Sequence, residues 1–291
     1  MFRYSLWAVG AAASFSLMAV FVKLASGEFN AFELVFWRAL FTLAFMTFVV
    51  RTQRLSVRTR YAGGHLVRGT LGTASMVLWF FTIGKMPIST NMTLIYTTPI
   101  FMAAAFLAIA VFTKRRPAWG TILAILAGFS GITLVLRPSF EAGYLAPSLI
   151  CLSSAAIDMF VYFQMQYLGK RQEPSWRIVF YFALMSVCVA PVGAVLFSTG
   201  MHLPRPDTVW AVLGMGLCGT MGQLCTTKAY TNGNLLLSAC LGFTAIPFSA
   251  LIGVVFFSDA IDAPTALGMA IVIAASVFAT VYTRRREAGG A

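Results

Sequence analysis

Two charged side chains inside long apolar runs are the residues of this sequence best placed to do chemistry. Asp158 lies within the apolar run 144–168, about 21 Å along a helix from its start. Arg38 lies within the run 30–50. A charge inside a hydrocarbon core of about 30 Å is costly, so it commonly serves binding or proton transfer. Asp158 suits a substrate ammonium group or a coupling proton, and Arg38 suits a carboxylate; a structural hydrogen bond is the alternative for Asp158.

Polar and aromatic residues of the same and neighbouring runs can complete a binding site. Helical spacing puts Cys151, Ser154 and Tyr162 on the face of Asp158. Aromatic rings stack on aromatic or cationic solutes, although packing is the alternative for any single ring. We predict these substrate-binding residues: Asp158, Arg38, Trp79, Tyr96, Tyr162, Gln223, Thr97 and Thr227.

Two prolines stand near the middle of apolar runs. Pro99 and Pro247 cannot donate to the carbonyl groups four residues earlier, which belong to Ile95 and Phe243. A freed carbonyl in hydrocarbon must be satisfied by protein or by cavity water. We therefore predict hinge or gating positions, with a packing kink as the alternative, at Pro99, Pro247, Gly72 and Gly219.

Composition excludes a water-soluble enzyme, a disordered chain and a disulfide-stapled domain. Of the 291 residues, 59% are hydrophobic and 10% are charged, and the mean hydropathy is +0.83. A soluble domain is roughly 25% charged. Five cysteines lack CxxC spacing, and the two histidines fall in expected loops, so we expect no metal, no cofactor and no catalytic dyad.

Ten apolar runs are long enough to span a bilayer as helices, which predicts an all-α integral membrane protein. Their connections are short, so no soluble domain is inserted. We expect residues 1–25 to be the first helix and not a cleaved signal, because the apolar run is long for one. The runs are 4–25, 30–50, 66–85, 88–112, 117–136, 144–168, 175–198, 208–230, 234–257 and 264–283.

The net charge of +12 predicts orientation and not nucleic-acid binding. With the N-terminus inside, 15 of the 21 lysines and arginines gather on the cytoplasmic side, as the positive-inside rule requires. We therefore expect both termini in the cytoplasm. The 15 cations are Arg3, Arg51, Arg54, Arg58, Arg60, Arg68, Lys114, Arg115, Arg116, Lys170, Arg171, Arg177, Arg284, Arg285 and Arg286.

The two halves of the chain carry matching motifs. Gly69-x-x-Gly72-Thr73 matches Gly216-x-x-Gly219-Thr220 at an offset of 147, and Pro99 matches Pro247 at 148. Each repeat has five spans, and because this number is odd, the second copy enters the membrane from the opposite side. This predicts two inverted five-helix repeats, residues 1–140 and 141–291, with a substrate site between them near the midplane.

Residues 84–136 and 228–282 resemble the two EamA repeats of the drug/metabolite transporter superfamily. The family pattern is matched by Thr82, Pro99, Gly120 and Gly128 in the first repeat and by Ala229, Pro247, Asp259 and Gly268 in the second. Arg38 resembles the family's second-helix arginine. The chain departs from the pattern in having Asp259 where a glutamate is usual and no acid before Lys114.

The resemblance implies a secondary transporter of the bacterial inner membrane that works by alternating access, either as a monomer or as a homodimer. No ATP-binding motif is present, so a gradient drives it, with protons as a candidate coupling ion. Export of amino acids, including aromatic ones, is the expected function. The alternatives are an importer of a larger metabolite such as S-adenosylmethionine or riboflavin, and a membrane-embedded receptor or enzyme.

Overall fold

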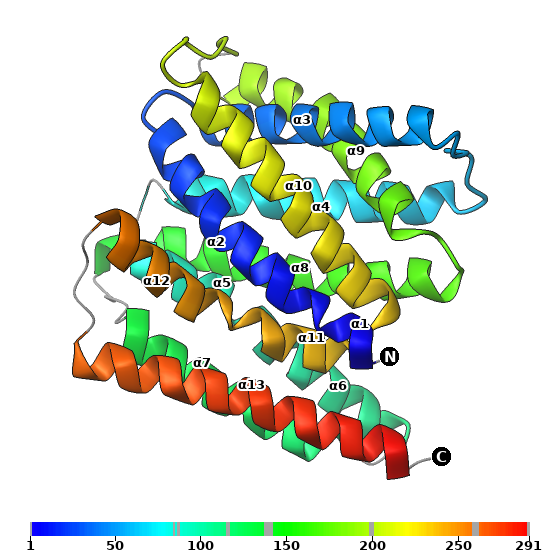
Figure 1. The fold of residues 1–291 in the computed structure, drawn as a ribbon, viewed down its shortest axis with the longest axis vertical. Coiled ribbons are helices and arrows are strands. Elements are labelled where there is room, and N and C mark those ends of the chain that lie inside the picture. Colours follow the sequence, from blue (N-terminus) through cyan, green and yellow to red (C-terminus); the bar gives the residue numbers. More distant parts are fainter. Residues whose placement is uncertain are drawn as a thin grey trace.

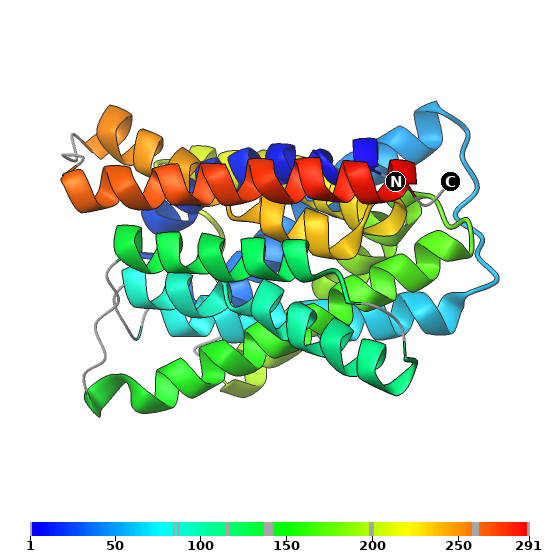
Figure 2. The same ribbon diagram turned by 90° about the horizontal axis from the view of Figure 1, so that it is seen from below.

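The computed structural model describes residues 2–83, 85, 88–114, 117–136, 142–197, 201–257 and 262–289. Of the residues discussed above, Arg115, Arg116 and Asp259 lie outside these ranges. The described chain forms a bundle of long helices that run side by side (Figures 1 and 2). The elements are α1 Phe2–Ser5, α2 Trp7–Ala25, α3 Ala31–Thr52, α4 Ala62–Ile83, α5 Ile88–Ile95, α6 Thr98–Phe112, α7 Trp119–Leu136, the 3₁₀ turn Ala142–Tyr144, α8 Leu145–Lys170, α9 Ser175–Phe197, α10 Val209–Asn232, α11 Leu235–Gly242, α12 Ala245–Phe257 and α13 Ala263–Gly289.

Each of the ten predicted runs is matched by one helix or by two short helices in line, so the all-α membrane architecture is confirmed. Within the described residues, nine helices are long and apolar enough to cross a membrane. The tenth, α4, has 22 residues, as many as α3, but it carries Arg68 together with glycines and hydroxyl side chains. It packs against α8 and α9, so protein and not lipid surrounds its polar face.

The start of α4 corrects one expectation. We predicted that the third run begins at residue 66, and we counted Arg68 among the cytoplasmic cations around the connection that precedes this run. The helix begins at Ala62, four residues earlier, so His65 and Arg68 both lie in it. Both side chains are buried, with 2% of their surface exposed.

Both helices with a central proline are interrupted. The gap between α5 and α6 falls at Tyr96 and Thr97, and the gap between α11 and α12 falls at Phe243 and Thr244. Each interruption begins three residues or more before its proline, because the ring of proline clashes with the turn that precedes it.

The carbonyl groups freed by these prolines are satisfied within the protein. The carbonyl of Ile95 accepts a hydrogen bond from Thr98 Oγ1 at 2.9 Å, and that of Phe243 accepts one from the Ile246 amide at 3.0 Å. A neighbouring helix also bonds to the backbone close to Pro247, since Ser16 Oγ of α2 donates to the carbonyl of Ala245 at 3.0 Å. The interruptions are therefore stable structural features and do not leave polar groups exposed to lipid.

The bundle is held by pairs of helices drawn from the two halves of the chain. Helix α7 lies along α13 and α2 lies along α10, while α3 packs on α9 and α4 packs on α8 (Figure 1). The first described helix, the C-terminal end of α13 and the α3–α4 connection share one end of the bundle (Figures 1 and 2). We call it the N/C end; the sequence predicts that it faces the cytoplasm.

The α7–α13 pair is close because small residues meet at its crossing. A Cβ atom built on Gly131 would lie 2.7 Å from the carbonyl oxygen of Gly268, and one built on Gly268 would lie 2.6 Å from that of Gly131. No Cβ atom fits at such a distance from a helix backbone. Gly131 of α7 and Gly268 of α13 therefore serve close helix packing within one chain.

We expect the Gly131→Ala substitution to destabilise the bundle, because the added methyl group forces α7 and α13 apart. Overpacking of this kind costs about 1–3 kcal/mol, which corresponds to a melting temperature several degrees lower in detergent. Gly27→Ala is the matched control, since a Cβ atom at Gly27 meets no atom within 4 Å. An equal effect of the two substitutions would contradict the close packing.

Candidate functional site

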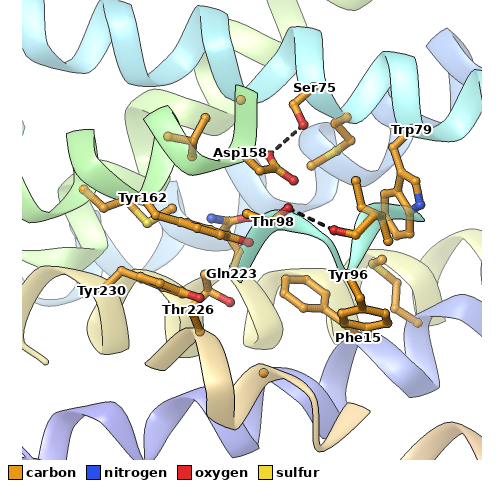
Figure 3. A pocket seen from close by; sticks show the side chains of 18 of the residues that line it. Phe15, Ser75, Trp79, Tyr96, Thr98, Asp158, Tyr162, Gln223, Thr226 and Tyr230 are labelled. Carbon is orange, nitrogen blue, oxygen red and sulfur yellow. Dashed lines mark hydrogen bonds between the residues drawn. The ribbon is translucent and has the colours of Figure 1, made fainter. Parts of the chain in front are cut away.

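A cavity of about 210 Å³ lies between the helices, and both halves of the chain line it (Figure 3). Its lining comes from α2, α3, α4, α5 and α6 on one side of the sequence and from α8 to α12 on the other. Pockets for drug-sized ligands measure roughly 300–1,000 Å³. The cavity therefore suits a small solute.

Asp158 points into the cavity from the middle of α8. It lies about 20 Å along the helix from Leu145. Its Oδ1 atom accepts a hydrogen bond from Ser75 Oγ of α4 at 2.6 Å (Figure 3). Among the described residues no hydrogen bond reaches its Oδ2 atom, so one carboxylate oxygen stays free to accept from a ligand.

The neighbours of Ser75 fix the position of Asp158. Ser154 Oγ, one turn earlier on α8, donates to the carbonyl of Ser75 at 2.8 Å, and the two hydroxyl groups are 3.0 Å apart. Ser154 and Ser75 are both buried. This hydroxyl seam holds α4 against α8 and orients the carboxylate, as a preorganised binding group requires.

Arg38 lines the same cavity from α3 with 3% of its surface exposed. Its Nη1 atom lies 2.8 Å from Met76 Sδ, and its Nη2 atom lies 3.4 Å from both the Gly219 carbonyl and Gln223 Oε1. Its Nε atom is buried without a partner. All these acceptors are neutral, so the positive charge of Arg38 has no counter-ion among the described residues.

A second guanidinium group in the cavity, that of Arg68, was not predicted. Arg68 lies on α4 and has Nε and Nη1 atoms that are buried without hydrogen-bond partners. Its guanidinium carbon lies 4.3 Å from the centre of the Phe182 ring of α9. The signal in the sequence was Arg68-x-x-x-Gly72, since these residues share one helix face.

Gly72 and Gly219 provide space for the two guanidinium groups. A Cβ atom on Gly72 would collide with Arg68 Nη1, and one on Gly219 would lie 2.6 Å from Arg38 Nε. Each glycine is about 15 Å from the start of its helix, near the middle of the bundle. Both lie inside unbroken helices; the hinge role that we assigned to them stays a prediction.

Aromatic rings form much of the remaining wall. Tyr162 of α8 and Tyr230 of α10 are stacked, with ring centres 4.0 Å apart and an angle of 6° between the planes (Figure 3). Trp79 also lines the cavity, and its Nε1 donates to Asn91 Oδ1 at 2.9 Å. Tyr96 lies at the α5–α6 gap. These rings offer flat apolar surfaces beside the charged groups.

Six of the eight predicted binding residues therefore line one cavity, and two do not. Thr97 donates its hydroxyl to the Leu94 carbonyl within the α5–α6 gap. Thr227 is fully buried in α10, where Gln223 Nε2 lies 3.5 Å from its hydroxyl. Pro99 lines the cavity, whereas Pro247 lies on α12 outside its lining. The binding roles remain predictions.

A buried glutamate at each end of the bundle joins the two halves of the chain. At the end opposite to the N/C end, Glu33 Oε1 of α3 accepts from the backbone amide of His202 at 2.6 Å and lies 2.8 Å from His202 Nδ1. At the N/C end, Glu173 Oε2 lies 3.3 Å from His65 Nε2 of α4 and 3.0 Å from Arg177 Nη1. Each contact ties the start of one helix to the other half.

The Glu173 contact also holds the α3–α4 connection in place. Thr59 Oγ1 donates to Glu173 Oε1 at 2.7 Å, and Arg177 Nη2 donates to the Ser56 carbonyl at 2.8 Å. Burial alone would raise the pKa of Glu173, but hydrogen bonds from Thr59, Arg177 and His65 outweigh it and lower this pKa below its ordinary value of 4.5.

A bundle of membrane-length helices around a central cavity with charged side chains is typical of one class, that of multi-pass transporters. The comparisons with known proteins agree. Residues 2–137 match the EamA-like transporter family. A solved crystal structure superposes with a TM-score of 0.83 at 19% identity, over 98% of this chain and 99% of that one. This likeness confirms the fold.

Curated relatives extend over nearly the whole chain. The pseudopaline exporter of Pseudomonas aeruginosa is 26% identical over 273 residues, which are 94% of each chain. The riboflavin transporter of Vibrio cholerae is 23% identical over 289 residues, 97% of this chain and 94% of that one. The first half of the chain is thus similar to the EamA-like transporter family, and nearly its whole length is similar to bacterial transporters of small molecules. The protein is therefore a transmembrane transporter and not an enzyme.

We predict that Glu173 makes the stability of the protein depend on pH. Because its pKa is lowered in the folded state, its stabilisation is complete above about pH 4.5 and is lost as the pH falls through the lowered value. The wild type should therefore lose several degrees of melting temperature on acidification that Glu173→Gln does not lose. Asp207→Asn, on an exposed turn, is the control and should follow the wild type. An equal fall in melting temperature at acid pH for the wild type and Glu173→Gln would refute this prediction.

Proposed function

We propose that the protein is a secondary active exporter of amino acids or related small metabolites, working by alternating access. The observation that carries the proposal is that Asp158 and Arg38, which have opposite charges, both line one central cavity. Asp158 has a free acceptor oxygen for an ammonium group, and Arg38 has an unpartnered donor for a carboxylate. The pair matches the two charges of a zwitterion.

The size and location of the cavity favour the same class. A volume of about 210 Å³ admits an amino acid with little room to spare. The charged groups lie near the middle of the bundle, the depth at which secondary transporters bind their solutes. The relative from Pseudomonas aeruginosa is an exporter, which favours outward transport here.

Alternating access requires two halves that can rock against each other, and we assign these to inverted repeats at 1–140 and 141–291. The helix pairs α2–α10 and α4–α8 are those that a two-fold exchange of the halves would interconvert. The paired gaps before Pro99 and Pro247 support the same assignment, and so do the contacts of Glu33 and Glu173 at opposite ends. In this proposal the Glu33 contact breaks when one end of the bundle opens, and the Glu173 contact breaks when the other end opens.

The driving force in this proposal is a gradient, with protons as the coupling ion. Asp158 is the coupling group, because it is an ionisable acid in the cavity that also meets the solute. The protein would lie in the bacterial inner membrane with its N/C end in the cytoplasm. It would act as a monomer or a homodimer.

A second candidate function is import of a larger metabolite such as riboflavin or S-adenosylmethionine. The flat surfaces of Trp79, Tyr96 and the Tyr162–Tyr230 stack favour a solute with an aromatic ring. One relative is a riboflavin transporter. Such a solute requires a cavity that widens beyond 210 Å³, so counter-flow with labelled solutes of both sizes separates the two candidates.

The zwitterion assignment predicts the effect of removing either charge. In proteoliposomes loaded with a panel of labelled amino acids, Asp158→Asn and Arg38→Gln should each lower flux at least about tenfold, because a buried group on the solute loses its charged partner. A pH gradient should change the wild-type flux and leave that of Asp158→Asn unaffected.

Matched controls separate these effects from loss of folding. Arg51→Gln lies on the same helix as Arg38 but is exposed, and Asp207→Asn is exposed outside the bundle. Both should transport like the wild type. Unchanged flux in the double variant Asp158→Asn with Arg38→Gln would rule the assignment out.

The cytoplasmic assignment of the N/C end is tested separately in whole cells. A cysteine introduced at Ser56 should resist a membrane-impermeant maleimide, whereas one introduced at Asp207 should react, because the two positions lie beyond opposite ends of the spans. The five native cysteines are replaced first. Reaction of the cysteine at Ser56, without reaction of the one at Asp207, would show that the N/C end faces away from the cytoplasm.

A further inference from the structure

The charges of the cavity do not balance. Arg38 and Arg68 each contribute a positive charge and Asp158 contributes one negative charge, so the described lining has a net charge of +1. Neither arginine forms an ion pair with any described residue. An uncompensated charge away from water is costly, so the occupied cavity needs a further negative group.

The hydrogen-bond donors show the same deficit. Of the guanidinium nitrogens that the described residues bring to this cavity, three are buried without an acceptor: Arg38 Nε, Arg68 Nε and Arg68 Nη1. Asp158 accepts from Ser75 and does not reach either arginine at ion-pair distance. A solute with one carboxylate can satisfy Arg38, and the donors of Arg68 then still lack an acceptor.

The surroundings of Arg68 keep its guanidinium group at the cavity. The side chain extends over Gly72, one turn further along α4 toward the middle of the bundle. Phe182 covers one face of the group at 4.3 Å, which restricts its rotation. An arginine that only anchored α4 to the membrane surface would extend toward the N/C end instead.

We infer that the transported solute carries a second acidic group and that Arg68 binds it. The substrate class is an amino compound with two carboxylates and a net negative charge, and this rests on the proposed function. Asp158 holds the ammonium group, Arg38 holds one carboxylate and Arg68 holds the other. With this solute the occupied cavity is neutral.

The test is counter-flow in proteoliposomes with two pairs of solutes that differ by one carboxylate. L-glutamate is compared with L-glutamine, and L-aspartate with L-asparagine. The wild type should carry each acid at least about ten times faster than its amide, because the amide leaves Arg68 unpaired. In Arg68→Gln the ratio should fall to about one, with the amide rate within about twofold of wild type.

A second variant tests the position of the guanidinium group without removing it. Gly72→Ala places a methyl group where Arg68 Nη1 lies, so the group must move and the acid-to-amide ratio should fall. Gly63→Ala, on the same helix, is the control, since a Cβ atom there meets nothing within 4 Å. Its ratio should equal that of the wild type.

Three outcomes would overturn the inference. Equal wild-type rates for acid and amide would show that the second acidic group is not recognised. An equal loss for acid and amide in Arg68→Gln would assign Arg68 a structural role beside Asp158. Absence of wild-type counter-flow for every amino acid tried would contradict the proposed function itself.

Discussion

The cost of placing guanidinium groups in the middle of a membrane-spanning bundle governs the rest of this structure. Arg38 and Arg68 are 3% and 2% exposed, so neither reaches water at the bundle surface. Space for them exists because Gly219 and Gly72 lack side chains at the same depth. The walls around them combine hydroxyl, amide and aromatic side chains with methionine and aliphatic ones, and α4, which carries Arg68, is not among the nine described helices that are apolar enough to span a membrane.

The helices interrupted before Pro99 and Pro247 must also satisfy polar groups inside the membrane, and here these groups are backbone carbonyls. A proline near the bilayer centre frees a carbonyl group, and this bundle satisfies both freed groups locally, through Thr98 and the Ile246 amide. The α5–α6 gap then places Tyr96 at the cavity wall. Irregular backbone at this depth is tolerated because protein surrounds it.

Hydrophobic periodicity predicted all ten helical runs, because a span of about 20 apolar residues has few alternative structures. It also predicted that Asp158, Arg38 and four further residues lie together. It failed at Arg68, since a cation six residues into a helix resembles one in the preceding positive-inside loop. Only the packing of Phe182 and the bare face at Gly72 draw that side chain inward. Thr97 and Thr227 lie outside the cavity lining, and local spacing does not reveal that their hydroxyl groups bond to the Leu94 carbonyl and to Gln223 Nε2.

The distribution of charge within the bundle argues that the cavity, and not the fold, lacks a negative group. At the two ends, the buried carboxylates of Glu33 and Glu173 each have a partner, His202 in one case and His65 with Arg177 in the other. The folded chain is therefore able to pair buried charges where it needs only stability. In the middle of the bundle positive charge is in excess over negative charge, and guanidinium donors are left without acceptors. Arg38 and Arg68 are buried without an ion pair to any described residue, and both line the cavity. A binding site for an anionic solute requires such groups, since the solute supplies the missing partner.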